Sequence, residues 1–223
     1  KVEFVGHPLL DVLAEIPSLE QARKQYRNSP LGHLIGLLPG SRRQEIALVL
    51  PEMLKAARML AADYDAVFLL GRSPHMDEKH FSLVSEFGDI RIVECTAYEV
   101  MRYSELELVT SGTATLESLC FGVPMIVLYK TAWLNYAVGR LLVRLTSISL
   151  ANIVTKGLGS KDQVVPELIQ HKATASEIYM IARRLLDQPA LLAEMRQELL
   201  DAREKLASAS PSLIGSEILQ EYL

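Results

Sequence analysis

Residues 37–42, Leu37-Leu38-Pro39-Gly40-Ser41-Arg42, end one structural pattern and begin another. The apolar run Leu34–Leu38 leads into this turn, and apolar residues recur after it at three- and four-residue spacing from Ile46 to Ala61. These patterns predict a buried strand and an amphipathic helix joined by a tight turn. Gly40 lets the backbone approach a ligand closely, and the free N–H groups of the first helical turn point toward it. Because the helix dipole is positive there, the turn favours an anion, most often a phosphate.

A second turn of this kind lies about 70 residues further along the chain, at Thr110-Ser111-Gly112-Thr113-Ala114-Thr115-Leu116-Glu117. It follows a predicted strand, Leu106–Thr110, and opens a predicted helix, Thr113–Cys120. Its hydroxyl and N–H groups can bind phosphate oxygens, or they can simply cap the helix. Either turn alone is typical of an ordinary strand-to-helix connection. Two of them, one with Arg42, favour a site that holds a diphosphate from two sides.

The region between and around the turns alternates strand and helix patterns. Further strands are predicted at Ala66–Leu70, Ile90–Val93 and Met125–Tyr129, and helices at Met76–Glu86 and Tyr98–Tyr103. Since the strands are continuously apolar, we predict an α/β fold, a Rossmann-like parallel sheet with helices on both faces. Ligands of such sheets bind beyond the carboxyl ends of the strands, where both turns lie.

The last third of the chain predicts mostly helices. Ala132–Leu145 is a mostly apolar helical pattern, Thr146–Gln163 is expected to be a loop, and Val165–Gln170 to begin another helix. Three consecutive helices then follow, at Thr174–Leu186, with Thr174 as its N-cap, Pro189–Ala207 and Leu213–Tyr222.

Composition limits the function further. With 49% hydrophobic and 22% charged residues among 223, a packed core is expected, and the net charge of −4 argues against a general nucleic-acid binder. Cys95 and Cys120 have no metal or redox spacing, so we expect buried thiols in a reducing cytosol. No cluster of His, Glu and Asp in the sequence suggests a metal site. No apolar run approaches the 18 residues that indicate a membrane span.

One long stretch lacks acidic residues. No Asp or Glu occurs from Ser118 to Lys161, while Trp133 and Tyr136 lie within it. This pattern suits an anionic, lipid-like ligand or an anionic membrane surface, and it equally suits a core helix with two snorkelling arginines. The cations of the stretch are Lys130, Arg140, Arg144, Lys156 and Lys161.

A series of short motifs spans nearly the whole chain. In order they are Val5-Gly6-His7-Pro8-Leu9 with Asp11, Leu38-Pro39-Gly40-Ser41-Arg42 with Glu45-Ile46, Ser111-Gly112-Thr113-Ala114-Thr115-Leu116-Glu117, Pro124 with Tyr129-Lys130, Ser149-Leu150, Asn152-Ile153 and Val165-Pro166-Glu167-Leu168-Ile169-Gln170. The series resembles the lipid-A-disaccharide synthase family. That family consists of inverting glycosyltransferases with the GT-B architecture, in which two Rossmann-like domains face a cleft. The resemblance implies transfer of 2,3-diacylglucosamine from UDP-2,3-diacylglucosamine to 2,3-diacylglucosamine 1-phosphate, with release of UDP.

The resemblance also implies a domain organisation. Residues 1–30 would be the crossover from an amino-terminal domain, residues 31–186 a UDP-sugar-binding domain, and residues 187–223 helices that pack back toward the first domain. The chain begins as a strand entered partway, at Lys1-Val2-Glu3-Phe4-Val5, so we expect a fragment. The family's proposed catalytic base lies in the amino-terminal domain, so no catalytic residue is assigned here. Ala151 and the stretch Val154–Gln163 depart from the family's pattern.

The binding residues follow from the two turns and the motifs. Gly40, Ser41, Arg42, Ser111, Gly112 and Thr113 are expected to hold the diphosphate. Glu117 would accept hydrogen bonds from the ribose, although it can also simply favour the helix dipole. The loop from Val93 to Ala97 would meet uracil. Motif membership alone suggests Asn152, Glu167 and Gln170 as contacts to the sugar or the domain interface.

The implied partners are the UDP-sugar donor and an acylated glucosamine phosphate acceptor, without a cofactor or a metal. A cytoplasmic position, peripheral at the inner membrane face, follows from the acyl chains and the basic stretch. The resemblance leaves open whether the chain forms a homodimer. Competing functions are a UDP-N-acetylglucosamine 2-epimerase, another GT-B enzyme and a non-catalytic UDP-sugar-binding module, since all of them use the same nucleotide site.

Overall fold

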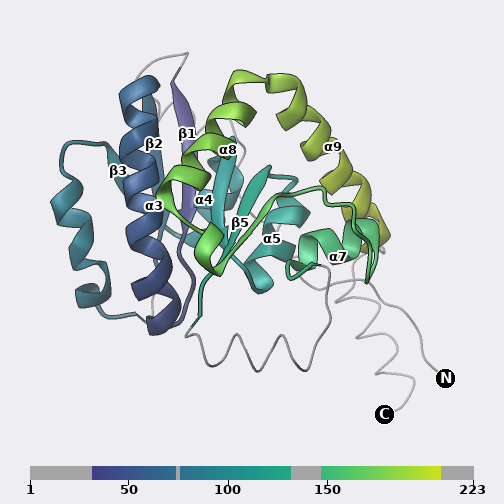
Figure 1. The fold of residues 1–223 in the computed structure, drawn as a ribbon, viewed down its shortest axis with the longest axis horizontal. Coiled ribbons are helices and arrows are strands. Elements are labelled where there is room, and N and C mark those ends of the chain that lie inside the picture. Colours follow the sequence, from purple (N-terminus) through teal and green to yellow (C-terminus); the bar gives the residue numbers. More distant parts are fainter. Residues whose placement is uncertain (1–31, 74–75, 132–146, 207–223) are drawn as a thin grey trace, which may run out of the picture.

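A computed structural model describes residues 32–73, 76–131 and 147–206 (Figure 1). The strands are β1 (His33–Leu38), β2 (Ala66–Gly71), β3 (Ile92–Cys95), β4 (Leu106–Thr110), β5 (Met125–Tyr129) and β6 (Glu167–Ile169). The α-helices are α3 (Arg43–Asp63), α4 (Ala97–Tyr103), α5 (Thr113–Phe121), α7 (Leu150–Lys156), α8 (Ala175–Asp187) and α9 (Pro189–Leu206), and the 3-10 segments are η1 (Glu78–Phe87) and η2 (Gln170–Lys172).

The six strands form one parallel sheet in the order β3-β2-β1-β4-β5-β6. Ile35 of β1 lies opposite Phe68 of β2 on one side and Leu106 of β4 on the other. The first three strands are added outward from β1 to β3 in one direction, and the last three from β4 to β6 in the opposite direction. The strand order therefore reverses where β1 and β4 lie side by side. In sheets of this kind, that reversal point is where the carboxyl ends of the strands leave room for a ligand. The predicted parallel sheet is confirmed.

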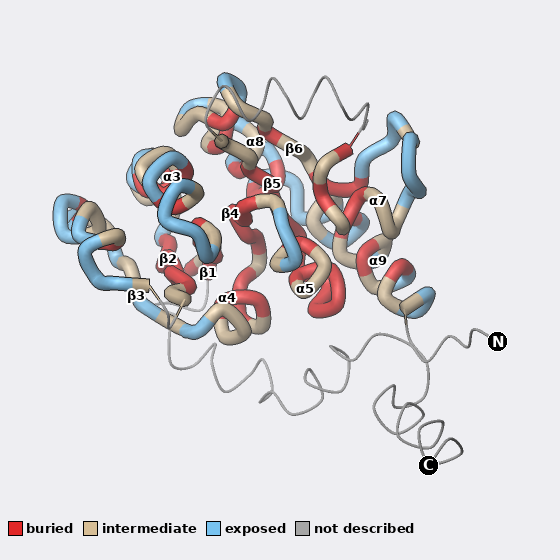
Figure 2. The backbone as a smooth tube through the Cα atoms, turned by 90° about the horizontal axis from the view of Figure 1, so that it is seen from below, coloured by how far each residue is buried: buried red, intermediate tan, exposed pale blue. Residues whose placement is uncertain are grey.

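Helices cover both faces of the sheet. On one face α3 packs against α8 and η1, and on the other α4 packs against α5, which also contacts α7 and α9. Figure 2 shows α3 and α8 on one side of the strands and α4 and α5 on the other. The four inner strands β1, β2, β4 and β5 are buried almost throughout, whereas the edge strands β3 and β6 are mostly half-buried, which is the pattern of a sheet between two helical layers.

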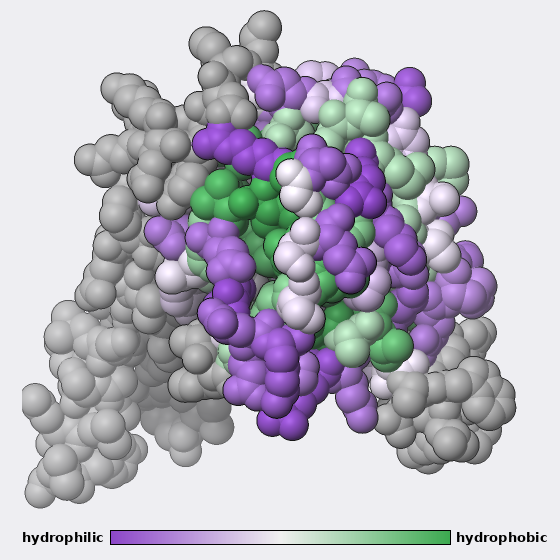
Figure 3. All heavy atoms as spheres, turned by 90° about the vertical axis from the view of Figure 1, so that its left-hand side faces the viewer, coloured by the Kyte–Doolittle hydropathy of each residue, from purple (hydrophilic) through white to green (hydrophobic). Residues whose placement is uncertain are grey.

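The surface over the outer edge of the sheet is largely polar. Figure 3 looks onto the side of the molecule that carries β3 and η1, where hydrophilic side chains frame a smaller apolar area. Across the described residues, no helix combines the length and the apolar character needed to cross a bilayer.

Local capping explains several helix starts. Thr174 caps α8 by accepting a hydrogen bond from the Glu177 N–H, as predicted. Thr96 and Glu99 form a capping box at the start of α4, in which each side chain accepts a hydrogen bond from the other residue's backbone N–H. These caps fix where the helices begin relative to the ends of the strands.

Four sequence-based expectations were wrong. Residues Glu167–Ile169, expected to lie in a helix, form β6, because the buried Val164, Val165 and Leu168 bring this segment alongside β5. The expected loop Thr146–Gln163 contains α7, which Ser149 caps. The expected helix Met76–Glu86 is the 3-10 segment η1, and β3 lies two residues later than expected.

Two further expectations fall outside the described residues: the helices at Ala132–Leu145 and Leu213–Tyr222. The proposed domain boundary at residues 186–187 stays a prediction. In the structure, α9 packs against α5, α7 and α8.

Candidate functional site

A pocket of about 860 Å³ lies at the carboxyl ends of β1 to β4. Its walls come from four connections: the β1–α3 turn, the residues after β2, the β3–α4 connection and the β4–α5 turn. This volume is within the usual range for small-molecule sites. The two turns singled out in the sequence, 70 residues apart, therefore face one cavity.

The β1–α3 turn needs glycine at position 40. Gly40 has φ +101°, and a Cβ there would lie 2.7 Å from a carboxyl oxygen of Glu45. Arg42 follows, with a side chain that is 77% exposed and donates to the Glu45 carboxylate over 2.6 Å. This hydrogen bond and the charge of Glu45 raise the pKa of Arg42, so the guanidinium stays cationic at the mouth of the pocket.

The β4–α5 turn is fixed by hydrogen bonds that leave its tip open. The Ser111 N–H donates to the Leu128 carbonyl over 2.8 Å, and the Ser111 hydroxyl donates to the Ile148 carbonyl over 3.1 Å. Gly112 and Thr113 are exposed, and no side chain caps the helix at Gly112. The first N–H groups of α5 therefore have no side-chain acceptor at the cap, which is the condition for binding an anion.

The wall after β2 and β3 carries a second ion pair. Arg72 donates to Glu94 over 2.5 Å, and its guanidinium lies 4.9 Å from the centre of the Phe81 ring. Only 23% of the Arg72 side chain is exposed. Sequence reasoning missed this pair because single charges after a strand give no periodic or motif signal.

An aromatic side chain closes the wall between β3 and α5. Tyr98, in the first turn of α4, lines the pocket and packs against Phe121, with 6.2 Å between ring centres. Burial, with a contribution from the negative charge of Glu117, raises the pKa of the Tyr98 hydroxyl, so it stays protonated near neutral pH. Sequence reasoning also missed Tyr98 as a site residue, although the short helix it opens was predicted.

Most of the sequence-predicted binding residues meet in this pocket. Gly40, Ser41, Arg42, Ser111, Gly112, Thr113 and Glu117 all line it. Among the residues that the structure describes, Val93 is not part of the lining, while its neighbours Glu94 to Ala97 are. Asn152, Glu167 and Gln170 lie outside the pocket.

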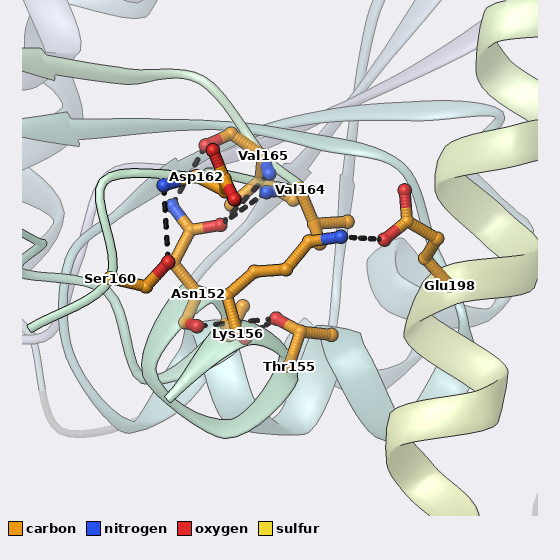
Figure 4. A network of polar contacts seen from close by, with 9 residues as sticks. Asn152, Thr155, Lys156, Ser160, Asp162, Val164, Val165 and Glu198 are labelled. Carbon is orange, nitrogen blue, oxygen red and sulfur yellow. Dashed lines mark hydrogen bonds and ion pairs between the residues drawn. The ribbon is translucent and has the colours of Figure 1, made fainter. Parts of the chain in front are cut away.

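Asn152 holds together the chain between α7 and β6 (Figure 4). Its buried amide group donates to the Val165 carbonyl over 2.9 Å and to Glu167 over 2.8 Å. Its side-chain oxygen accepts from the N–H groups of Val164 and Val165 over 2.8 and 3.0 Å. All four hydrogen-bonding positions of the amide are used, which indicates a structural role.

Glu167 links this network to the pocket. Its carboxylate accepts hydrogen bonds from the N–H groups of Ile148 and Ser149 over 2.9 and 3.1 Å, and from the Ser147 hydroxyl. The Ile148 carbonyl in turn accepts the hydroxyl of Ser111. Two of the motif residues therefore support the β4–α5 turn from behind, without lining the pocket.

Gln170 connects the ends of β5 and β6. Its side chain bonds to the N–H and carbonyl of Thr131 over 3.4 and 3.2 Å, and its backbone has φ +53°. A non-glycine residue in this left-handed region is uncommon. The two bonds to Thr131 hold it there.

Formal charge in the pocket is negative before any ligand binds. The lining carboxylates are Glu45, Glu94, Glu99 and Glu117, against the two cations Arg42 and Arg72. Within the described ranges, no three His, Cys, Asp or Glu side chains gather as metal ligands. Groups of the lining that can meet an anionic ligand include the two guanidinium groups and the N–H groups of the helix termini.

Comparison with known proteins places the chain in a family. The family model described as lipid-A-disaccharide synthetase matches residues 1–216. The chain is 36% identical to a lipid-A-disaccharide synthase of Geobacter sulfurreducens over 225 residues, covering 100% of this chain and 57% of that protein. For a lipid-A-disaccharide synthase of Nitrosococcus oceani the identity is 32%, over 96% of this chain and 55% of that protein. The chain thus spans about half the length of these relatives.

Solved structures share the fold at low sequence identity. A putative UDP-N-acetylglucosamine 2-epimerase from Listeria monocytogenes has a TM-score of 0.56 at 16% identity, covering 90% of this chain and 50% of that one. Os79 from O. sativa, solved in complex with UDP and deoxynivalenol-3-glucoside, has a TM-score of 0.55 at 15% identity, covering 96% of this chain and 47% of that one. At these identities the likeness shows the fold alone, which leaves the sequence to identify the family. On its motifs and the match over residues 1–216, the chain belongs to the lipid-A-disaccharide synthetase family.

Proposed function

We propose that this chain supplies the donor site of an inverting glycosyltransferase. The enzyme moves 2,3-diacylglucosamine from UDP-2,3-diacylglucosamine to 2,3-diacylglucosamine 1-phosphate and releases UDP. Family membership and the pocket support this proposal together. The observation that carries it is that the amino ends of α3 and α5, neither of which has a side-chain cap, line one cavity together with Arg42, the N-cap residue of α3.

The diphosphate lies between the two turns in this proposal. Arg42 donates to phosphate oxygens, and the N–H groups at Gly112 and Thr113 donate from the opposite side. Glu117, one turn into α5, accepts hydrogen bonds from the ribose hydroxyls. Uracil meets the wall from Glu94 to Ala97, next to the Tyr98 ring.

The chemistry is a single displacement at the anomeric carbon. As the glycosidic bond to UDP breaks, negative charge builds up on the leaving diphosphate. Arg42 and the positive ends of α3 and α5 stabilise that charge, because they are already in place before the bond breaks. We assign the base that removes the acceptor's proton to the family's amino-terminal domain, and no catalytic residue to this chain.

Contact with an anionic membrane is part of the same proposal, because donor and acceptor both carry acyl chains. The structure narrows which cations of the basic stretch can contribute. Lys130 pairs with Glu52 on α3, and Lys156 pairs with Glu198 on α9 (Figure 4). Lys161 is exposed, and Arg140 and Arg144 lie outside the described residues. The acylated acceptor, the position at the inner membrane face and a homodimer stay proposals.

Calorimetry with UDP tests the donor site. The chain should bind UDP, and Arg42→Ala should weaken binding about 10- to 100-fold, the usual effect of losing charge-assisted hydrogen bonds. The matched control is Arg43→Ala, which removes the neighbouring exposed cation that does not line the pocket and should change the affinity less than about threefold. If the parent chain does not bind UDP, or if both variants lose the same amount of UDP affinity, the proposed donor site is refuted.

A further inference from the structure

The carboxylate of Glu45 occupies the inside of the β1–α3 turn. One of its oxygens accepts from Arg42 over 2.6 Å, and the other lies where a Cβ on Gly40 would approach within 2.7 Å. The Glu45 side chain is 18% exposed, whereas that of Arg42 is 77% exposed. An internal anion therefore lies at the amino end of α3, on the side of the turn where a ligand anion is favoured.

We propose that Glu45 is an internal competitor for Arg42: the ligand diphosphate displaces the Glu45 carboxylate on binding, and Glu45 takes the guanidinium back when UDP leaves. This inference rests on the proposed donor site and concerns how that site loads and releases its ligand. It gives a function to a pocket carboxylate that would otherwise only oppose an anionic ligand.

The exchange is physically easy at this position. Arg42 is the exposed partner of this ion pair, so water solvates its guanidinium once the two charges separate, whereas Glu45, only 18% exposed, stays at the positive amino end of α3, which stabilises its charge. The Arg42 guanidinium is mostly in solvent, so it can turn from a carboxylate to a phosphate without crossing a buried barrier. A diphosphate carries more negative charge than one carboxylate and also accepts hydrogen bonds from the helix N–H groups. It therefore displaces the Glu45 carboxylate from Arg42 when it is present.

The second ion pair of the pocket lacks these properties. Arg72 is only 23% exposed, and the ring of Phe81 lies against its guanidinium. Releasing Arg72 from Glu94 would leave a largely buried cation without its partner, which is costly. The exchange is therefore assigned to Arg42 and Glu45 rather than to both pairs.

Neutralising Glu45 should strengthen ligand binding. Glu45→Gln keeps the size and the contact with Gly40 but removes the charge that competes for Arg42. We expect UDP to bind about 3- to 10-fold more tightly, mostly through slower dissociation, while uridine, which has no phosphate, should bind unchanged. Calorimetry gives the affinities, and stopped-flow displacement gives the dissociation rates.

A matched control and a double variant separate competition from a general loss of negative charge. Glu99→Gln removes another pocket carboxylate, and glutamine preserves the capping box with Thr96. In an Arg42→Ala background, Glu45→Gln should improve UDP binding no more than Glu99→Gln does in the parent. Equal gains with and without Arg42 would show that Glu45 acts only through general repulsion.

The outcomes also separate this inference from the donor site itself. If the parent binds UDP and Arg42→Ala weakens binding, but Glu45→Gln leaves the affinity unchanged or lowers it, the donor site stands and the competition is refuted. If the parent does not bind UDP, both fail. If Glu45→Gln does not fold, the side-chain NMR signal of Arg42 in the parent protein tests the exchange instead. It must shift when inorganic pyrophosphate is added, and an unchanged signal alongside measurable pyrophosphate binding overturns the inference.

Discussion

Replacing Glu107 by Gln should stabilise the protein increasingly as the pH rises from about 5 to 8. Glu107 lies in the centre of β4 and is fully buried, with its Cγ packed over Gly36 of the neighbouring β1. Within the described part of the chain, neither of its carboxyl oxygens has a hydrogen-bond partner. Burial raises the pKa of this carboxyl from 4.5 to about 8, and the nearby Ser118 hydroxyl and the charge of Arg196 offset only part of the effect.

The sign follows from proton binding. Between pH 4.5 and about 8 the native protein keeps a proton on Glu107 that the unfolded chain has lost. The free energy of unfolding therefore falls as the pH rises through this window, by about 1.4 kcal/mol per pH unit, and levels off above it. Across the whole window the loss is roughly 5 kcal/mol, a large part of the stability of an ordinary domain.

Urea unfolding followed by circular dichroism at pH 5, 6, 7, 8 and 9 measures this effect. The stability of Glu107→Gln relative to the parent should rise with pH and then level off above pH 8. A constant offset between the two proteins reflects packing of the amide and does not matter, because the slope carries the prediction. Glu204→Gln, at an exposed position on α9, is the matched control and should show no such slope. Parallel pH profiles for the parent and Glu107→Gln would refute the buried, protonated carboxyl.

Three other predictions concern the ligand and the membrane. Glu117→Ala should weaken UDP binding about 5- to 10-fold, the range expected for lost hydrogen bonds to the ribose, but leave pyrophosphate binding unchanged; calorimetry showing equal losses for both ligands would support a dipole role instead. Removing divalent metals with EDTA should leave UDP affinity within about twofold, because Arg42 and two helix termini hold the diphosphate; a loss that Mg²⁺ or Mn²⁺ restores would contradict this. The chain should co-sediment with vesicles that contain anionic lipid, and Arg140→Glu/Arg144→Glu should reduce this at low salt, since each basic residue near such a surface contributes about 1 kcal/mol. Equal pelleting of the double variant and the parent would assign the membrane contact to other residues.

The sequence predicted the parts of the site that rest on local patterns. Gly40 and Gly112 each follow an apolar strand and precede a helix, so the two turns and their place at one edge of the sheet could be inferred without coordinates. Parallel strands bring their carboxyl ends together, which is why turns 70 residues apart face one pocket.

Features that depend on contacts between distant residues could not be inferred in this way. The pairing of Arg72 with Glu94 joins two different strand ends, and the partners of Lys130 and Lys156 come from α3 and α9. A stretch without acidic residues in the sequence is therefore not free of carboxylates in space. β6 was mistaken for a helix because a strand of three residues is too short to show the two-residue alternation of a strand.

Asn152 and Glu167 show a different limit. Their motifs suggested contacts to the sugar or the domain interface, but motif membership does not say whether a side chain meets the ligand or supports the backbone that does. The hydrogen bonds of Asn152 all lie within the fold, and Glu167 is linked to the pocket through Ile148 and Ser111.

A crystal structure of this chain with UDP tests the central claim most directly. The account predicts diphosphate oxygens within hydrogen-bonding distance, about 3 Å, of the Arg42 guanidinium and of the N–H groups at the start of α5. It also predicts the ribose next to Glu117 and uracil along residues 94–97. UDP ordered outside the pocket, or bound inside it with its phosphates away from both turns, would contradict the account.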